Sequence, residues 1–404
     1  MEPTSPPPGP EGAAETEAVG SPVASGAWAP PDAPSGRRRR VGDRSARRRR
    51  IFFAVLAVIS IIGCAGFLVH VPYTTISPGA SVPLSGRVSI EGARTYEHRR
   101  GDVQLLFVSE RNHVNVWEYL RARLDANTEI VSDSVATGGE PSADLAAEAY
   151  ADMESAKLAA TKVALERAGY RVPPSAGALV LAPLPSRRGA AALEAGDVMV
   201  AFGGRPVRTT GDLARAVSAH RVGESVETTV LRSGRRKVVR VRLSAGPEGA
   251  PVIGVRVFPS YRFPVTVKID TSGIGGPSAG LAMTLAILDD LTPGDLTGGN
   301  RVAATGTIDV RGRVGPIGGI QQKGVSARAA GATIFLVPAC PTASEVSPSA
   351  RAACGRDLSE LRRRAGRRVA VVPVTDLADA LAALHERGGA VVVPIGAAAE
   401  ATLA

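Results

Sequence analysis

An uncharged apolar run near the start of the chain sets the strongest limit on how the chain can fold. Ile51–Val69 spans nineteen residues without a charged side chain. At about 1.5 Å per residue, a helix of this length crosses most of the roughly 30 Å hydrocarbon core of a bilayer. Arg37–Arg40 and Arg47–Arg50 precede it, and clustered arginines favour the cytoplasmic side. We therefore expect one transmembrane helix at 51–69 in the cell membrane, with the N-terminus cytoplasmic and everything after Val69 outside.

Two other interpretations of the apolar run stay open. A cleavable signal peptide is one, although its apolar core is normally shorter. Processing at Ile61-Ile62-Gly63-Cys64, with a lipid attached to Cys64, is the other. All three interpretations send the remainder across the membrane. Residues 1–36 are rich in Pro, Gly, Ala, Ser and Glu and lack a hydrophobic period, so we expect a disordered cytoplasmic tail and an Arg-rich juxtamembrane segment at 37–50.

The composition allows several folded units and argues against nucleic acid as a partner. The chain has 404 residues, 44% of them hydrophobic, which suffices for two or three compact units. Its formal charge of +10 is concentrated in short runs, which include Arg235–Lys237 and Arg362–Arg364. No run is interleaved with aromatic residues, so the stacking side chains of nucleic-acid-binding surfaces are missing.

Cys340 and Cys354 lie 14 positions apart in a segment rich in Pro, Ser and Ala. If that segment is extracytoplasmic, we expect a disulfide between them. Two unpaired thiols are the alternative. No CxxC or neighbouring histidine supports a metal site.

Residues 171–248 have the pattern of short strands around one helix. An L-x-x-G-D-x-M core begins at Leu193, an amphipathic stretch covers Thr210–His220, and strands at Ser225–Arg232 and Lys237–Leu243 turn at Ser233-Gly234. This arrangement resembles the PDZ domains of bacterial proteases. The resemblance implies a groove that takes up an extended peptide by strand addition. Its carboxylate-binding turn would map onto Gly177, Ala178, Leu179 and Val180. A small β domain without peptide binding is the alternative.

A serine follows a Gly-rich turn in the next block. Val265–Ile269 alternates like a strand, Ser272–Gly280 contains Gly276-Pro277-Ser278, and Leu281–Leu291 is an apolar helical stretch. A serine between a tight turn and a helix N-terminus is presented on a constrained bend, where free backbone N–H groups can stabilise an oxyanion. We place the oxyanion region at Gly276 and Ser278. Pro277 offers no donor.

A second block contributes a threonine and a lysine. Thr305-Gly306-Thr307-Ile308 leads through Gly312–Ile320 to Gln321-Gln322-Lys323. Together, G-P-S-A-G, T-G-x-I, G-x-V-x-P-I-G-G-I and x-x-K resemble, in this order, the proteolytic domain of Lon peptidases (family S16). The resemblance implies an α+β fold without a cofactor, with Ser278 as nucleophile and Lys323 as general base. It also implies that Thr305 orients the lysine.

The chemistry agrees with this resemblance. A lysine serves as base only if its surroundings lower its pKa toward neutrality, and Lys323 follows a stretch rich in Gly and Ile. All five histidines lie outside the block from Ser278 to Lys323, which gives a Ser-His-Asp triad little support, and H-E-x-x-H does not occur. One departure is that many Lon peptidases carry an acidic residue shortly before Gly-Pro-Ser, where this chain has Ile274-Gly275-Gly276.

The peptidase domain is predicted to be split. An amphipathic helix is predicted from Asp152 to about Ala168. It resembles the M-x-E-S-A helix of Lon domains, and we expect Ser155 to have a structural role and not a catalytic one. Residues 72–170 would supply the first part of the Lon-like domain and 250–396 the part with the dyad, with the PDZ-like unit inserted between them. This order resembles the membrane-anchored PDZ-Lon proteins (the YlbL type) of Gram-positive bacteria.

No G-x-x-x-x-G-K-[ST] occurs in the sequence, so we expect serine endopeptidase activity without ATP on peptides or unfolded chains. The expected partners are protein substrates and, through 51–69, membrane lipid. Lon domains often form rings, but nothing in the sequence fixes an oligomeric state. A catalytically inactive peptide-binding scaffold at the membrane is the alternative function.

Overall fold

The computed structural model describes residues 43–97 and 100–392. The predicted tail at 1–36, the run Arg37–Arg40 and His98 lie outside these residues. Helix α1 runs from Asp43 to Leu68. Its Ala46–Leu68 part is long and apolar enough to cross a membrane, in agreement with the predicted anchor. Cys64 is an exposed free cysteine on this helix.

From Ile62 onward the described residues form one compact unit, built on a six-stranded sheet. The strand order is β18-β17-β14-β3-β1-β4. Three strands precede the PDZ-like segment: β1 (Tyr73–Pro83), β3 (Asp102–Arg111) and β4 (Glu129–Ser132). Three follow it: β14 (Arg301–Ala304), β17 (Ile334–Pro338) and β18 (Ala370–Val374). Because β14 pairs in parallel with β3, segments far apart in the chain form one sheet, which agrees with a split α+β domain.

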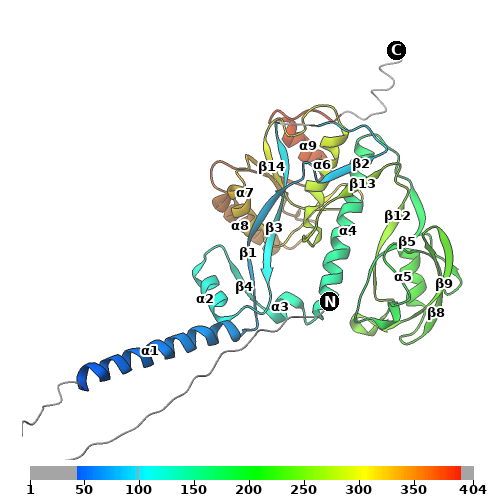
Figure 1. The fold of residues 1–404 in the computed structure, drawn as a ribbon. Coiled ribbons are helices and arrows are strands. Elements are labelled where there is room, and N and C mark those ends of the chain that lie inside the picture. The colour runs from blue at the N-terminus through cyan, green and yellow to red at the C-terminus, as the bar shows by residue number, and fades with distance from the viewer. Residues whose placement is uncertain (1–42, 98–99, 393–404) are drawn as a thin grey trace, which may run out of the picture. The chain divides into compact units, whose positions relative to one another are not determined.

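Helices cover this sheet and complete its core (Figure 1). Helix α4 (Ser142–Arg167) packs against α6 (Gly280–Leu291), which is almost entirely buried. Helix α7 (Ile320–Ala329) packs against β1 and β3, and α8 (Pro348–Ala365) packs against α7. The remaining helices of this part are α2 (Val116–Leu124), α3 (Asp133–Thr137) and α9 (Leu377–His385). Two short ribbons pair β2 (Val88–Glu91) with β13 (Thr266–Ile269) and β15 (Thr307–Ile308) with β16 (Val314–Gly315).

The PDZ-like unit has its own sheet, in the order β12-β5-β6-β8-β9. Its strands are β5 (Pro174–Pro183), β6 (Val198–Phe202), β8 (Ser225–Arg232), β9 (Arg235–Arg242) and β12 (Val255–Tyr261), with β7 (Arg205–Pro206) beside β6. Helix α5 (Thr210–Ser218) and the ribbon of β10 (Ser244–Ala245) and β11 (Pro251–Val252) accompany it. The predicted boundary at 248 is too early, because β12 pairs along β5 and completes the sheet.

Strand β5 joins the two folded parts. Ala178 and Val180 belong to the core of the PDZ-like unit, whereas Leu181 belongs to the main core and Leu179 packs against that core. Successive side chains of a strand point to opposite faces. One strand therefore contributes to both cores, which ties the inserted unit to the main domain.

Cys340 and Cys354 are paired in the structure, with their Cα atoms 5.7 Å apart. The bridge holds the segment after β17 against α8. Closing a loop of this length restricts the unfolded chain and is worth about 3 kcal/mol.

We therefore expect Cys340→Ser/Cys354→Ser to lower the free energy of unfolding by about 3 kcal/mol, measured by urea denaturation. Dithiothreitol should have the same effect on the wild type and none on the double variant. Equal urea midpoints for wild type and variant would contradict this assignment.

Candidate active site

Ser278 lies on a sharp bend directly before α6. Pro277–Ala279 forms a single 3₁₀ turn, η3, that continues into the helix. Gly276 precedes it with φ of +86°, a left-handed conformation that side-chain-bearing residues rarely adopt. The glycine allows the chain to reverse immediately before Ser278, and the proline starts the turn at a position that needs no N–H donor.

The segment after β14 holds this bend in place. The Gly306 N–H donates to the Ser278 carbonyl oxygen at 2.9 Å, and the Leu281 N–H donates to the Gly306 carbonyl oxygen at 3.1 Å. The Thr305 hydroxyl also donates to the Ser278 carbonyl oxygen, at 3.2 Å. The T-G pair of the sequence motif therefore fixes the backbone that carries the serine.

Lys323 comes from the first turn of α7 and reaches both hydroxyl groups. Its Nζ lies 2.8 Å from Ser278 Oγ and 3.2 Å from Thr305 Oγ1. The lysine is only 2% exposed and Thr305 is fully buried. The structure thus brings together Ser278, Lys323 and Thr305, the three residues singled out from the sequence.

Burial changes the acidity of the lysine. Loss of hydration lowers the pKa of Lys323 from 10.5 to about 8, and the negative charge of Glu110 partly opposes this effect. A buried ammonium with a pKa near 8 can release its proton close to physiological pH, as a general base must. Glu110, on β3, has no motif in the sequence. Its effect on the pKa of Lys323 follows from the packing of α7 on β3, which brings the two residues near each other.

The oxyanion expectation needs one correction. The Gly276 N–H donates to the Ala149 carbonyl oxygen of α4 at 3.1 Å, so this amide is not free to bind an oxyanion. The Ser278 N–H lies at the start of the turn, where backbone donors have no partner within the helix. This leaves the Ser278 N–H as the predicted oxyanion donor.

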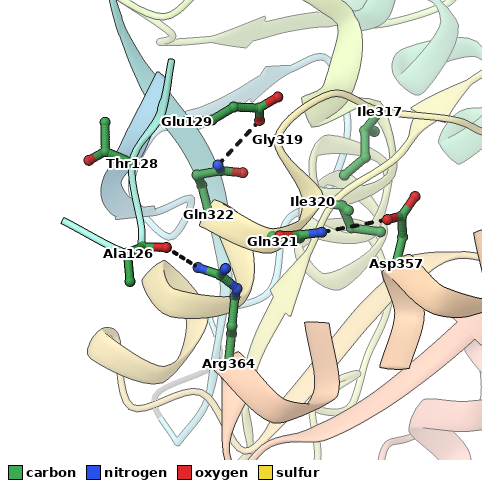
Figure 2. A pocket seen from close by; sticks show the side chains of 10 residues that line it. All are labelled: Ala126, Thr128, Glu129, Ile317, Gly319, Ile320, Gln321, Gln322, Asp357 and Arg364. Atoms are coloured by element: carbon green, nitrogen blue, oxygen red, sulfur yellow. Dashed lines mark hydrogen bonds between the residues drawn. The ribbon is translucent and has the colours of Figure 1, made fainter. Parts of the chain in front are cut away.

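A polar cavity of about 500 Å³ opens beside the start of α7. Figure 2 shows that Arg364 donates to the Ala126 carbonyl oxygen and that Gln322 points toward Glu129. Ile317 and Ile320 add apolar surface. Neither Ser278 nor Lys323 lines this cavity, which therefore lies beside the Ser–Lys contact and not at it.

Comparison with known families matches a segment in each of the two folded parts. Residues 265–347 match the Lon protease (S16) C-terminal proteolytic domain, and residues 174–243 match the PDZ domain. The chain contains a Lon-type proteolytic domain and a PDZ domain. The Lon-type match includes Ser278, Thr305 and Lys323.

Individual relatives agree with this assignment. A Lon protease from Phenylobacterium zucineum is 35% identical over 140 residues, which is 34% of this chain and 16% of that protein. A probable periplasmic serine endoprotease DegP-like from Rhizobium meliloti is 40% identical over 83 residues, 19% of this chain and 16% of that protein. The chain thus matches only a small part of the length of these relatives.

Among solved structures, the PDZ domain of an SdrC-like protein from Listeria innocua is 22% identical. The match covers 20% of this chain and 92% of that one, with a TM-score of 0.19.

The PDZ domain requires a second correction. Gly177–Val180 does not form a turn but lies inside β5. This part of β5 pairs with β12 on one side and with β6 on the other, so it has no free edge to which a peptide could add. Strand β12 pairs only with β5 in this sheet and contacts α5. The two outer strands of this sheet are therefore β12 and β9, of which β12 lies beside α5.

The described histidines lie away from the Ser–Lys contact. His70 and His385 contact backbone carbonyl oxygens, whereas His113 and His220 pair with Asp133 and Glu224. None of these four makes a hydrogen bond or ion pair with Ser278 or Lys323, so a Ser-His arrangement has no support among the described residues.

Proposed function

We propose that this protein is a membrane-anchored, extracytoplasmic serine endopeptidase with a Ser278–Lys323 dyad, active without ATP. The observation that carries the proposal is the 2.8 Å contact between Lys323 Nζ and Ser278 Oγ, made by a lysine that is 2% exposed. Burial favours the neutral amine, and the neutral amine is the form that can accept a proton from the serine.

The reaction follows the order of acyl transfer. Neutral Lys323 takes the hydroxyl proton as Ser278 Oγ bonds to the carbonyl carbon of the substrate. The C–N bond then breaks, and Lys323 returns the proton to the departing amine. Lys323 next takes a proton from water as the water oxygen bonds to the ester carbonyl carbon. The bond from that carbon to Ser278 Oγ then breaks, Oγ takes back the proton from Lys323, and the acyl part leaves as a carboxylic acid. The Thr305 hydroxyl keeps the amine aimed at Oγ, and the Ser278 N–H stabilises the oxyanion.

The extracytoplasmic location rests on two features. Arg47–Arg50 lie before the apolar part of α1, which favours an N-terminus on the cytoplasmic side. The Cys340–Cys354 disulfide supports an oxidising compartment for the folded part. ATP is scarce there, which agrees with cleavage of peptides or loosely folded chains.

Cleavage of casein by the full chain in detergent, without nucleotide, tests the proposal. We expect hydrolysis that ATP and magnesium leave unchanged and that rises with pH through about 8, because Lys323 must lose its proton and its pKa is about 8. A wild-type chain without cleavage activity across this pH range would contradict the proposal.

We further propose that the PDZ domain takes up the end of a substrate chain along β12. An added strand would hydrogen-bond to the free edge of β12 and lie beside α5. Val255 and Val257 pack against the PDZ core, so the groove would have an apolar floor suited to apolar side chains.

Hydrogen–deuterium exchange with an apolar C-terminal peptide tests this groove. We expect slower exchange in Val255–Tyr261 and Thr210–Ser218, because bound peptide covers both elements. Arg235–Arg242, the other edge of the same sheet, is the matched control and should not change. Protection confined to that control strand would contradict the assignment.

A further inference from the structure

Helix α2 carries an exposed apolar face. Trp117, Leu120 and Leu124 are 38%, 46% and 89% exposed. At 3.6 residues per turn they lie within about 60° of one another, so they form one stripe. The opposite side of the helix contains the buried Ala122. A contiguous apolar stripe with an aromatic residue is expensive to expose to water.

This stripe adjoins the end of the anchor helix. The Trp117 indole N–H donates to the Gly63 carbonyl oxygen of α1 at 2.9 Å. A Cβ atom added at Gly66 would lie 2.2 Å from Trp117 Nε1. The indole therefore rests directly on the two glycines of the last turns of α1, and no larger residue fits at Gly66.

The length of α1 determines where this contact lies relative to a bilayer. The residues from Ile51 to Ile62 would span about 18 Å as a helix, and those from Ile51 to Leu68 about 27 Å. The hydrocarbon core is roughly 30 Å thick. Residues 63–68 are therefore needed to cross it, and Trp117, which contacts two of them, must reach the same depth.

Charged residues are arranged to match this position. Arg121 and Arg123 are exposed and flank the apolar stripe, one on each side. Glu118 lies away from the stripe and pairs with Arg111 at 2.8 Å. Basic side chains beside an apolar face are typical of helices that lie in the membrane–water interface. There the basic side chains contact lipid phosphates.

We propose that α2 lies in the outer headgroup region of the membrane, with Trp117, Leu120 and Leu124 facing the acyl chains and Arg121 and Arg123 facing the phosphates. The inference rests on the proposed anchoring by α1. Helix α2 lies between β3 and β4 of the six-stranded sheet in the chain. A second membrane contact through α2 would therefore fix the orientation of this sheet at the membrane surface.

Quenching of tryptophan fluorescence by brominated lipids tests this position. The chain has two tryptophans, so Trp28→Phe leaves only Trp117. The variant is placed in vesicles of phosphatidylcholine and phosphatidylglycerol with bromines either near the headgroups or near the bilayer centre. We expect bromines near the headgroups to remove most of the Trp117 emission, and central bromines to remove much less. Leu124→Glu in the same chain should weaken this quenching, whereas Val238→Glu on β9 should not.

A second tryptophan position separates this inference from the anchor itself. In Trp28→Phe/Trp117→Phe/Ile59→Trp, the only tryptophan lies near the middle of the apolar run, and central bromines should quench it. Quenching there without quenching of Trp117 would overturn the α2 proposal and leave the anchor intact; α2 would then face water or another protein. Absence of quenching at both positions would remove the anchor and the α2 proposal together.

Discussion

Ser278→Ala and Lys323→Met are each expected to lower kcat/KM for casein-derived peptides by about 10⁴-fold or more, because each removes one member of a unit that works only as a pair. Lys323 Nζ and Ser278 Oγ lie 2.8 Å apart. The double variant should be no less active than either single variant, since the first loss already removes the mechanism. Initial rates of peptide cleavage measure all three.

Matched controls are available close to the site. Ser272 lies in the same loop and bonds to Asp270, whereas Lys268 is exposed and pairs with Glu91. Ser272→Ala and Lys268→Met should keep activity close to the wild type. Thr305→Val should fall between the two groups, because it removes a positioning hydroxyl but no reacting group. Equal activity of Ser278→Ala and Ser272→Ala would exclude the assigned nucleophile.

Lys323→Met is also expected to raise the stability of the folded protein, by as much as about 3 kcal/mol at pH 7. Below about pH 8 both the folded and the unfolded chain carry the protonated amine. The folded chain holds that charge in a buried site, where its pKa falls from 10.5 to about 8. Methionine has a similar length and no charge, so the variant avoids this cost.

The pH dependence gives this prediction a specific sign. Between about pH 8 and 10.5 the unfolded wild type binds more protons at this lysine than the folded wild type does, so wild-type stability rises relative to the variant. The difference in urea midpoint between wild type and Lys323→Met should therefore shrink as pH rises. Lys268→Met is the control and should show no such trend. A variant less stable than the wild type at pH 7 would contradict the lowered pKa.

The sequence was sufficient to predict the Ser–Lys–Thr contact and the split fold. It was not sufficient to predict which strand forms the outer edge of the PDZ sheet or which backbone N–H groups near Ser278 are already hydrogen-bonded. Ser278, Thr305 and Lys323 lie in short sequence motifs, and the Gly and Pro residues of these motifs set the local backbone conformation. The position of the peptide-accepting edge depends instead on β12 pairing with β5, a contact between segments far apart in the chain. The Gly276 N–H is likewise hydrogen-bonded to the carbonyl oxygen of Ala149 in α4, which is far from Gly276 in the sequence. No periodicity or spacing encodes either contact.

We expect Ser278 to become covalently acylated during turnover. The most direct measurement is acid quenching of the wild-type chain during hydrolysis of an activated peptide ester, followed by mass mapping of the protein fragments. We predict one acyl group on the fragment that contains Ser278, and none on that fragment in Ser278→Ala. An acyl group on another residue, or sustained turnover in Ser278→Ala, would contradict it.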